Sequence, residues 1–324
     1  MSVILLILFM IVSYAAFETK INLKAKGNIY DKGDLCYETE TNIDGTLTIT
    51  NYDETCGVNV DIPKRVKGKI VTGIGDSAFE NKKIKALKLP DTLTSIGRSA
   101  FQRNEIEEVE IPPKITRISP YAFKGNKLTY LKLNDGLKQI GIDAFMSNNL
   151  TEINIPKTVT SLEGGTFASN NLTGDEAYIY GINSDGSINY THLDSYAGKN
   201  ATGTKIPETV KTLGLEAYAN VRYDEIDVPA GIKEIPGYCF NSTYATKITL
   251  HEGLEKINAA AFGATKITEI TIPSSVTYIS DKAFTCTDSE CSPPLKIINV
   301  NKEENSIENA PWGAINATIN WKNQ

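Results

Sequence analysis

The sequence is poor in the residues and motifs that usually carry catalysis. Only two histidines are present, His192 and His251, and neither belongs to an H-E-x-x-H motif or lies beside paired C-x-x-C cysteines. A G-x-S-x-G nucleophile elbow, a P-loop and a dinucleotide-binding glycine pattern are also missing. We therefore expect no enzymatic activity, no cofactor and no metal site.

An excess of positive charge is missing as well. The chain has 33 Lys and Arg against 39 Asp and Glu, which gives a formal net charge of −6 at pH 7. The two signs are mixed along the chain, and no run of five or more like charges occurs. Because nucleic acids and anionic membranes both attract basic patches, neither is an expected partner.

Long apolar runs are missing after the first 16 residues. The initial apolar segment ends in Ser13 and Ala15, small residues two apart that are typical of a signal-peptidase site. We expect a signal peptide over residues 1–16, although the basic residue that usually precedes the apolar core is absent. The rival interpretation is an uncleaved N-terminal anchor, through which alone the chain would contact a membrane.

Cysteines number five, which suits an oxidising compartment with one thiol left unpaired. Cys36 and Cys56 lie at the start of the repeats described below, where a bridge would stabilise the first coil by about 3 kcal/mol. Cys286 and Cys291 flank a short segment that a second bridge would close, worth about 2 kcal/mol. Cys239 stands where most coils have alanine, so we interpret it as a small buried residue and not as a nucleophile.

What the sequence does have is a 22-residue period. Aromatic residues recur at this interval, are interrupted once and then resume: Phe79, Phe101, Phe123, Phe145 and Phe167, then Tyr218, Phe240, Phe262 and Phe284. A prolyl position repeats in the same phase: Pro90, Pro112 and Pro156, then Pro207, Pro229 and Pro273. Such a period is typical of a solenoid, in which each coil buries its apolar face against its neighbours.

One coil, residues 89–111, illustrates the expected structure. Residues 106–111 alternate in hydrophobicity, which predicts a short strand with Val109 and Ile111 pointing inward. Residues 99–102 are expected to form a single helical turn. Stacking these coils predicts an α/β solenoid, with a parallel sheet on one face and short helical turns on the other.

The repeated Ile-Pro…Val/Ile…Ile-Gly…Ala-Phe…Asn…Leu…Leu pattern resembles the BspA-like, or Treponema-type, leucine-rich repeats of bacterial surface and secreted proteins. The resemblance covers about residues 62–172 and 206–300, in nine in-phase copies. It implies a right-handed leucine-rich-repeat coil and a role in binding host matrix proteins, other cells or glycans. Some coils depart from the pattern, since Val221, Thr243 and Thr265 replace the turn asparagine.

The flanking segments are similar to the caps of this family. Residues 44–50 with Cys56 look like its N-terminal cap strand, and residues 309–321 look like its C-terminal cap; caps shield the open ends of a parallel sheet. Between the arrays, residues 173–205 break the period, and their Ser-Asp-Gly turn between apolar runs predicts a β-hairpin insert.

The expected organisation therefore has six segments. They are a signal peptide (1–16), an N-terminal cap (17–61), five coils (62–172), a β-hairpin insert (173–205), four coils (206–294) and a C-terminal cap (295–324).

The outward side of the strands is the expected binding surface, because the sheet face of a solenoid is a common site for partners. The ligand-binding candidates are the polar or aromatic members of two outward columns: Lys88, Glu108, Glu110, Tyr130, Lys132, Glu152, Asn154, Glu225, Asp227 and Lys247. Tyr130 adds an aromatic ring of the kind that interfaces favour. The alternative interpretation is that alternating Lys and Glu keep a parallel sheet soluble and in register.

The insert is a second candidate surface. It is rich in tyrosines that we expect to be exposed: Tyr178, Tyr180, Tyr190 and Tyr196. The alternative is that these rings pack the insert onto the solenoid.

Two functions remain open on the sequence. The favoured one is an exported bacterial adhesion or binding protein whose ligand is a protein or glycan at the cell surface or in the host matrix. The other is a structural or self-associating component of the cell envelope. The first predicts sensitivity to charge reversal at Lys88, Lys132 and Glu110, whereas the second predicts multimers that are indifferent to it.

Overall fold

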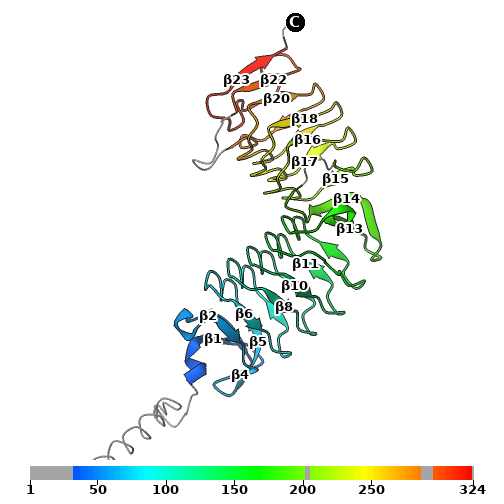
Figure 1. Ribbon diagram of the computed structural model, residues 1–324. Helices are drawn as coiled ribbons and strands as arrows, with labels where there is room; N and C mark the ends of the chain where they lie inside the picture. Colours follow the sequence, from blue (N-terminus) through cyan, green and yellow to red (C-terminus); the bar gives the residue numbers. More distant parts are fainter. Residues whose placement is uncertain (1–31, 201–204, 286–294, 323–324) are drawn as a thin grey trace, which may run out of the picture.

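The structure is a computed structural model that describes residues 32–200, 205–285 and 295–322. In Figure 1 the coils stack one on another from β2 to β23, and the stack bends where β13 and β14 lie. The expected signal peptide and the Cys286–Cys291 pair lie outside the described residues.

Most coils add a short strand to a first set of parallel strands, and the coil of residues 152–154 does not. These strands are β3 (Asn59–Asp61), β6 (Ala86–Lys88), β8 (Glu108–Glu110), β10 (Tyr130–Lys132), β16 (Glu225–Asp227), β18 (Lys247–Thr249), β20 (Glu269–Ile272), β22 (Ile297–Val300) and β23 (Thr318–Trp321). The register follows the 22-residue period, since Tyr130 lies opposite Glu108. In β8 the middle residue, Val109, is buried and its two neighbours are exposed, as the pleat of a strand requires.

A second set of parallel strands, which the sequence analysis did not predict, follows on the next side of each coil. It begins with β5 (Lys69–Ile74), which also pairs with β2 and with β4 (Arg65–Val66). The later strands are two residues long: β7 (Ser95–Ile96), β9 (Arg117–Ile118), β11 (Gln139–Ile140), β12 (Ser161–Leu162), β15 (Thr212–Leu213), β17 (Glu234–Ile235), β19 (Lys256–Ile257) and β21 (Tyr278–Ile279). Their isoleucines, such as Ile96 and Ile118, are buried.

The predicted α/β class, with helical turns, is wrong. Among the described residues there are three short 3-10 helices, η1 (Lys32–Cys36), η2 (Glu54–Cys56) and η3 (Gly174–Ala177), and all three lie outside the repeat coils. The segments that were expected to be helical form consecutive tight turns instead.

Hydrogen bonds between coils explain this difference. The Phe101 N–H donates to the Ala122 carbonyl of the next coil at 2.8 Å, and the Ser99 N–H donates to the Pro120 carbonyl at 3.0 Å. Ser99 itself has a φ of 54°, which is the left-handed region. Because these amides are used between coils and left-handed residues cannot continue a right-handed helix, the fold is a β-solenoid.

The repeat aromatics form stacked rows in the core. Neighbouring rings lie between 5.0 and 5.8 Å apart. The first row runs Phe79, Phe101, Phe123, Phe145 and Phe167, and the second runs Tyr196, Tyr218, Phe240, Phe262 and Phe284. All ten rings are at most 6% exposed, so each adds both apolar burial and ring stacking.

Buried asparagines close the turns beside the first row. Asn126 donates through Nδ2 to the carbonyls of Phe101 and Phe123, at 2.9 and 3.0 Å, and its Oδ1 accepts from the Ile106 N–H at 3.2 Å. Asn104, Asn148 and Asn170 repeat the arrangement. The side chain thereby links two consecutive coils.

Both ends of the stack are covered. At the N-terminal end, β1 (Tyr37–Thr41) and β2 (Leu47–Tyr52) pair antiparallel, and Tyr52 stacks on Phe79 at 5.2 Å. A disulfide joins Cys36 to Cys56 in this cap. At the other end lies Trp312, whose side chain is fully buried and whose backbone carbonyl accepts a hydrogen bond from the Phe284 N–H at 3.0 Å.

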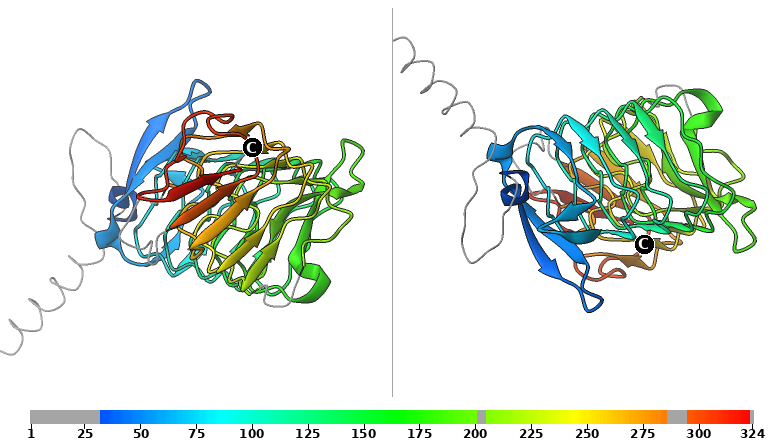
Figure 2. Two further views of the ribbon diagram at one scale, coloured as in Figure 1. Left: turned by 90° about the horizontal axis from the view of Figure 1, so that it is seen from above. Right: turned by 90° about the horizontal axis from the view of Figure 1, so that it is seen from below.

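The insert is a β-hairpin, and part of it belongs to the stack. Strands β13 (Tyr178–Ile182) and β14 (Ile188–Tyr196) are antiparallel, and in both views of Figure 2 they lie at the opposite edge of the molecule from β1 and β2. The end of β14 pairs with β15 through Leu193 and Leu213, and Tyr196 stacks on Tyr218 at 5.5 Å. The hairpin therefore projects at its tip and forms part of an extra coil at its base.

Candidate ligand-binding surface

The ten sequence-predicted site residues are all exposed, but they do not form one surface. Five of them lie on β6, β8 and β10 in the first array: Lys88, Glu108, Glu110, Tyr130 and Lys132. Glu152 and Asn154 follow in the next coil, where no strand is formed. Glu225, Asp227 and Lys247 lie on β16 and β18, beyond the bend made by the insert. The structure thus divides the candidates into two groups.

Four members of the first group, all except Lys132, line a hollow of about 690 Å³ over β3, β6, β8 and the start of β10. We call it the sheet-face hollow, and its exposed polar and aromatic lining consists of Asn59, Asp61, Lys85, Lys88, Glu107, Glu108, Glu110 and Tyr130. Ala86 stands opposite Asn59 in the register, one coil before Glu108, and carries only a methyl group. The small side chain leaves space on the sheet between its larger neighbours, with Val60, Leu87 and Val109 at the floor.

Ion pairs join neighbouring coils across this sheet. Lys132 Nζ lies 3.0 Å from Glu110 Oε2, and Lys88 Nζ lies 3.9 Å from Asp61 Oδ2. A hydrogen bond from Lys132 to Glu110, and the negative charge of that carboxylate, raise the pKa of the lysine. Both pairs are well exposed, so solvent screens the charges and each pair contributes little to stability. This arrangement favours the interpretation that such charges help to keep the register.

Other side chains of the surface have no such structural role. Within the described part of the chain, the side chains of Glu108, Tyr130, Glu152 and Asn154 have no hydrogen-bond or ion-pair partner. Tyr130 is 43% exposed. Because the fold does not use these groups, they are available to a ligand. Two of them, Glu108 and Tyr130, line the sheet-face hollow.

The second group is paired more completely. Lys247 Nζ lies 3.2 Å from Glu225 Oε2, and His251 Nε2 lies 2.6 Å from Asp227 Oδ1. All three predicted site residues of this group therefore contact a neighbouring side chain. His251, the residue at the prolyl position of its coil, has an evident structural use here.

The prediction that the insert exposes its tyrosines is wrong for three of the four. Tyr196 is 2% exposed and belongs to the core row, and Tyr178 packs edge-on against it at 5.3 Å while donating to the Lys205 carbonyl. Tyr180 is half-buried against Tyr190, which alone is well exposed, at 58%. The rings chiefly pack the insert, because β14 is built into the stack.

A buried charged cluster near the bend was missed by sequence reasoning. Lys124 Nζ contacts the carboxylate of Asp143 and lies 3.5 Å from Glu216 of the second array. Burial and the nearby Glu216 carboxylate raise the pKa of Asp143 to about 8. Burial opposes the charge on Lys124, but the two carboxylates outweigh it and raise the lysine pKa. Gly165 leaves room for the cluster, since a Cβ there would lie 2.3 Å from Asp143 Oδ1.

Within the residues that the structure describes, no three or more His, Cys, Asp and Glu side chains are arranged to hold a metal ion. Across the same residues, no helix is long and apolar enough to cross a membrane. Burial raises the pKa of the free Cys239 thiol, which disfavours the reactive thiolate.

The geometry defines a repeat solenoid with an exposed, partly hollowed sheet face. Residues 58–174 and 187–310 match the family described as BspA type leucine-rich repeat region, in six copies. The match covers well over half of the chain, which therefore belongs to this family of leucine-rich-repeat proteins. The resemblance seen in the sequence is thus confirmed, and no catalytic family is indicated.

Solved structures show the same fold. A leucine-rich cell surface protein from Faecalibacterium prausnitzii is 20% identical over 89% of this chain and 94% of its own, with a TM-score of 0.51. The pneumococcal vaccine antigen PcpA is 16% identical over 89% of this chain and 97% of its own, with a TM-score of 0.52. At these identities the likeness concerns the fold alone. No curated protein matches the sequence.

Proposed function

We propose that this chain is an exported bacterial surface protein that binds a protein ligand through the sheet-face hollow and thereby serves adhesion. The observation that carries the proposal is the hollow itself. The small side chain of Ala86 leaves space at its floor, and it is bordered by Glu108 and Tyr130, two side chains that form no contact needed by the fold. Protein interfaces favour this combination of an aromatic anchor with a polar rim. The family to which the chain belongs supports a binding role over a catalytic one.

Export is part of the proposal and rests on two features. Residues 1–16 have the composition of a signal peptide, and the Cys36–Cys56 disulfide suits an oxidising compartment. Mass spectrometry of protein recovered from the cell surface and medium tests it. Export with cleavage predicts an N-terminus at residue 16 or 17, whereas an intact segment 1–16 supports the anchor instead.

The binding experiment presents the chain from residue 17 onward to arrayed fibronectin, laminin, collagen, neutral and acidic glycans, and the chain itself. Saturable binding to a protein is the expected result. Binding only to itself would leave the structural, self-associating role in its place.

Exchanging the charges of the Lys88–Asp61 pair then distinguishes a role in ligand binding from a role in fixing the strand register. Lys88→Asp alone breaks the pair with Asp61, and Lys88→Asp with Asp61→Lys restores the pair with its charges exchanged. If the hollow binds the ligand, both variants lose affinity at least tenfold, although the double variant regains the wild-type unfolding midpoint. If the double variant also regains binding, these residues act only through the fold.

The matched control is the Lys247–Glu225 pair in the second array. Exchanging its charges alters the same kind of cross-coil pair at a distance from the hollow. The proposal predicts unchanged ligand affinity for this control, and an equal loss would place the function elsewhere on the chain.

A further inference from the structure

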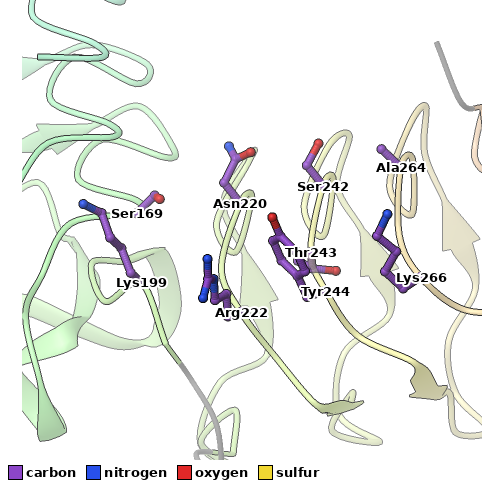
Figure 3. A pocket seen from close by; sticks show the side chains of 9 residues that line it. All are labelled: Ser169, Lys199, Asn220, Arg222, Ser242, Thr243, Tyr244, Ala264 and Lys266. Atoms are coloured by element: carbon purple, nitrogen blue, oxygen red, sulfur yellow. The ribbon is translucent and has the colours of Figure 1, made fainter. Parts of the chain in front are cut away.

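A second cavity lies on a different edge of the solenoid, beside the turns of the second array. It has a volume of about 350 Å³, and its lining includes Lys199, Asn220, Arg222, Ser242, Thr243 and Tyr244. Figure 3 shows Asn220, Ser242 and Ala264 at the tips of successive turns, with Lys199, Arg222, Tyr244 and Lys266 in a second row beside them. None of the described residues that line the cavity is an aspartate or glutamate.

The repeat shows that this cluster is not a general property of the coils. The position that directly follows the turn asparagine forms a column along the stack. In the first array this column holds Glu105 and Lys127, which form an ion pair of 2.8 Å between neighbouring coils. In the second array the same column holds Arg222, Tyr244 and Lys266, so that the acidic member is replaced by a cation or an aromatic ring. In an acidic protein of net charge −6, Arg222 and Lys199 thus place two positive charges beside this cavity.

A backbone hydrogen bond between neighbouring coils is also missing at this cavity, among the residues that the structure describes. In the preceding coils the amide of the column residue donates to a carbonyl one coil earlier, as Lys127 does to Ile106 at 3.0 Å and Arg222 does to Lys199 at 2.8 Å. Tyr244 and Tyr223, both described residues, have no such bond. The buried asparagine of the first array is also absent, since Thr243 takes its place and its Oγ1 has no hydrogen-bond partner among the described residues.

The cation of Arg222 is held in place by a neighbour of the next coil. Its guanidinium lies over the Tyr244 ring, 5.3 Å from the ring centre, and Tyr244 is itself 53% exposed. Lys199 is fixed by a hydrogen bond to Asn149 Oδ1, a neutral acceptor, at 2.9 Å. Neither contact neutralises the charge. A guanidinium fixed in this way can donate two parallel hydrogen bonds to a carboxylate.

We propose that this cavity binds an acidic sugar, such as the uronic or sialic acid unit of a glycan. The carboxylate is bound by Arg222 and Lys199, and the sugar hydroxyls by Asn220 and Ser242. The volume of about 350 Å³ is at the small end of the range for ligand pockets. It is also about ten times the ~30 Å³ share of one water molecule, so a sugar ring fills it better than an inorganic anion does.

The test is isothermal titration calorimetry of the full-length chain with four probes: N-acetylneuraminic acid, methyl glucuronide, methyl glucoside and sodium sulfate. Both acidic sugars, or one of them, are expected to bind saturably, at least tenfold more tightly than methyl glucoside and sulfate. No binding of either acidic sugar at millimolar concentration overturns the proposal. So does equal binding of the neutral sugar, or of sulfate.

Arg222→Gln is expected to weaken binding of the acidic sugar at least tenfold, and Arg222→Lys, which keeps the charge but not the planar fork, by about three- to tenfold. Lys127→Gln is the matched control, because Lys127 occupies the same column in the first array; its affinity should stay within twofold of the wild type. Thermal melting confirms that each variant is folded. Equal losses in the Arg222 and Lys127 variants overturn the assignment. Variants of the sheet-face hollow should not alter sugar binding, so the two proposals fail independently.

Discussion

Replacing Asn126 by alanine should destabilise the first array in a way that the structure makes quantitative. The side chain is 7% exposed and bonds to three backbone groups, the Ile106 N–H and the carbonyls of Phe101 and Phe123. The two carbonyls keep a second donor, because Asn104 also donates to Phe101 and Asn148 to Phe123. Only the Ile106 N–H loses its acceptor entirely.

The expected loss follows from this difference. An unsatisfied buried amide costs about 1–3 kcal/mol, and each bond lost from a carbonyl that keeps another donor costs about 0.5–1 kcal/mol. We therefore expect Asn126→Ala to lower the free energy of unfolding by about 2–5 kcal/mol. The reverse change, Thr243→Asn, supplies the missing side chain in the second array and should stabilise it by about 1 kcal/mol.

Urea unfolding measures both changes, and hydrogen exchange locates the first. Protection of the Ile106 amide should fall in Asn126→Ala more than that of amides bonded only between strands. A loss below about 1 kcal/mol with Ile106 still protected would refute this account of the asparagine row. Destabilisation by Thr243→Asn would show that the second array uses a different turn.

Three further predictions concern the core, the cap and the bend. Phe123→Ala removes a fully buried ring that is stacked between Phe101 at 5.3 Å and Phe145 at 5.5 Å. It should lower the free energy of unfolding in urea by about 3–5 kcal/mol, and a loss below about 1 kcal/mol would contradict the stacked core. The double variant Cys36→Ser, Cys56→Ser removes a disulfide between residues 20 positions apart and should destabilise the N-terminal cap by about 3 kcal/mol. Reductant should likewise lower the melting temperature of the wild type, and an unchanged temperature would contradict this prediction. Asp143 has its pKa raised to about 8 from about 3.9 in the unfolded chain, so its stabilising contribution is complete below pH ~4 and is lost as the pH rises through about 8. In thermal melts, the stability of Asp143→Asn relative to the wild type should therefore increase as the pH rises from 5 to 8. A difference in melting temperature between the two proteins that stays constant over this range would contradict the raised pKa.

The spacing of a single residue type predicts much of this fold. Phe79 to Phe167 recur every 22 residues and form one stacked row, and the alternation around Val109 places the strand β8 correctly. Residues 99–102 were predicted to be helical because local pattern does not reveal where an amide donates. The bond from Phe101 to Ala122 in the next coil, and the positive φ of Ser99, decide that backbone, and both are tertiary effects.

The candidate sites show a similar division. The outward columns correctly identified exposed residues, but which of them pair depends on reach across coils, as for Lys132 and Glu110. The extra coil was missed because Tyr196 follows Phe167 by 29 residues, which breaks the phase of the first array; the signal that could have found it is that Tyr196 precedes Tyr218 by 22 residues. The cavity beside Arg222 did leave a trace in the sequence, since Arg222, Tyr244 and Lys266 are spaced by 22 residues with no acidic residue among them.

The most direct test of the central claim compares two exposed tyrosines. Tyr130 borders the sheet-face hollow and is 43% exposed, whereas Tyr278 lies on β21 of the second set of strands and is 48% exposed. Surface plasmon resonance would measure the affinity of Tyr130→Ala and Tyr278→Ala for the arrayed protein that binds the wild type. A loss of at least tenfold in Tyr130→Ala alone is the predicted result. Equal affinities in the two variants would contradict the placement of the binding function on the sheet-face hollow.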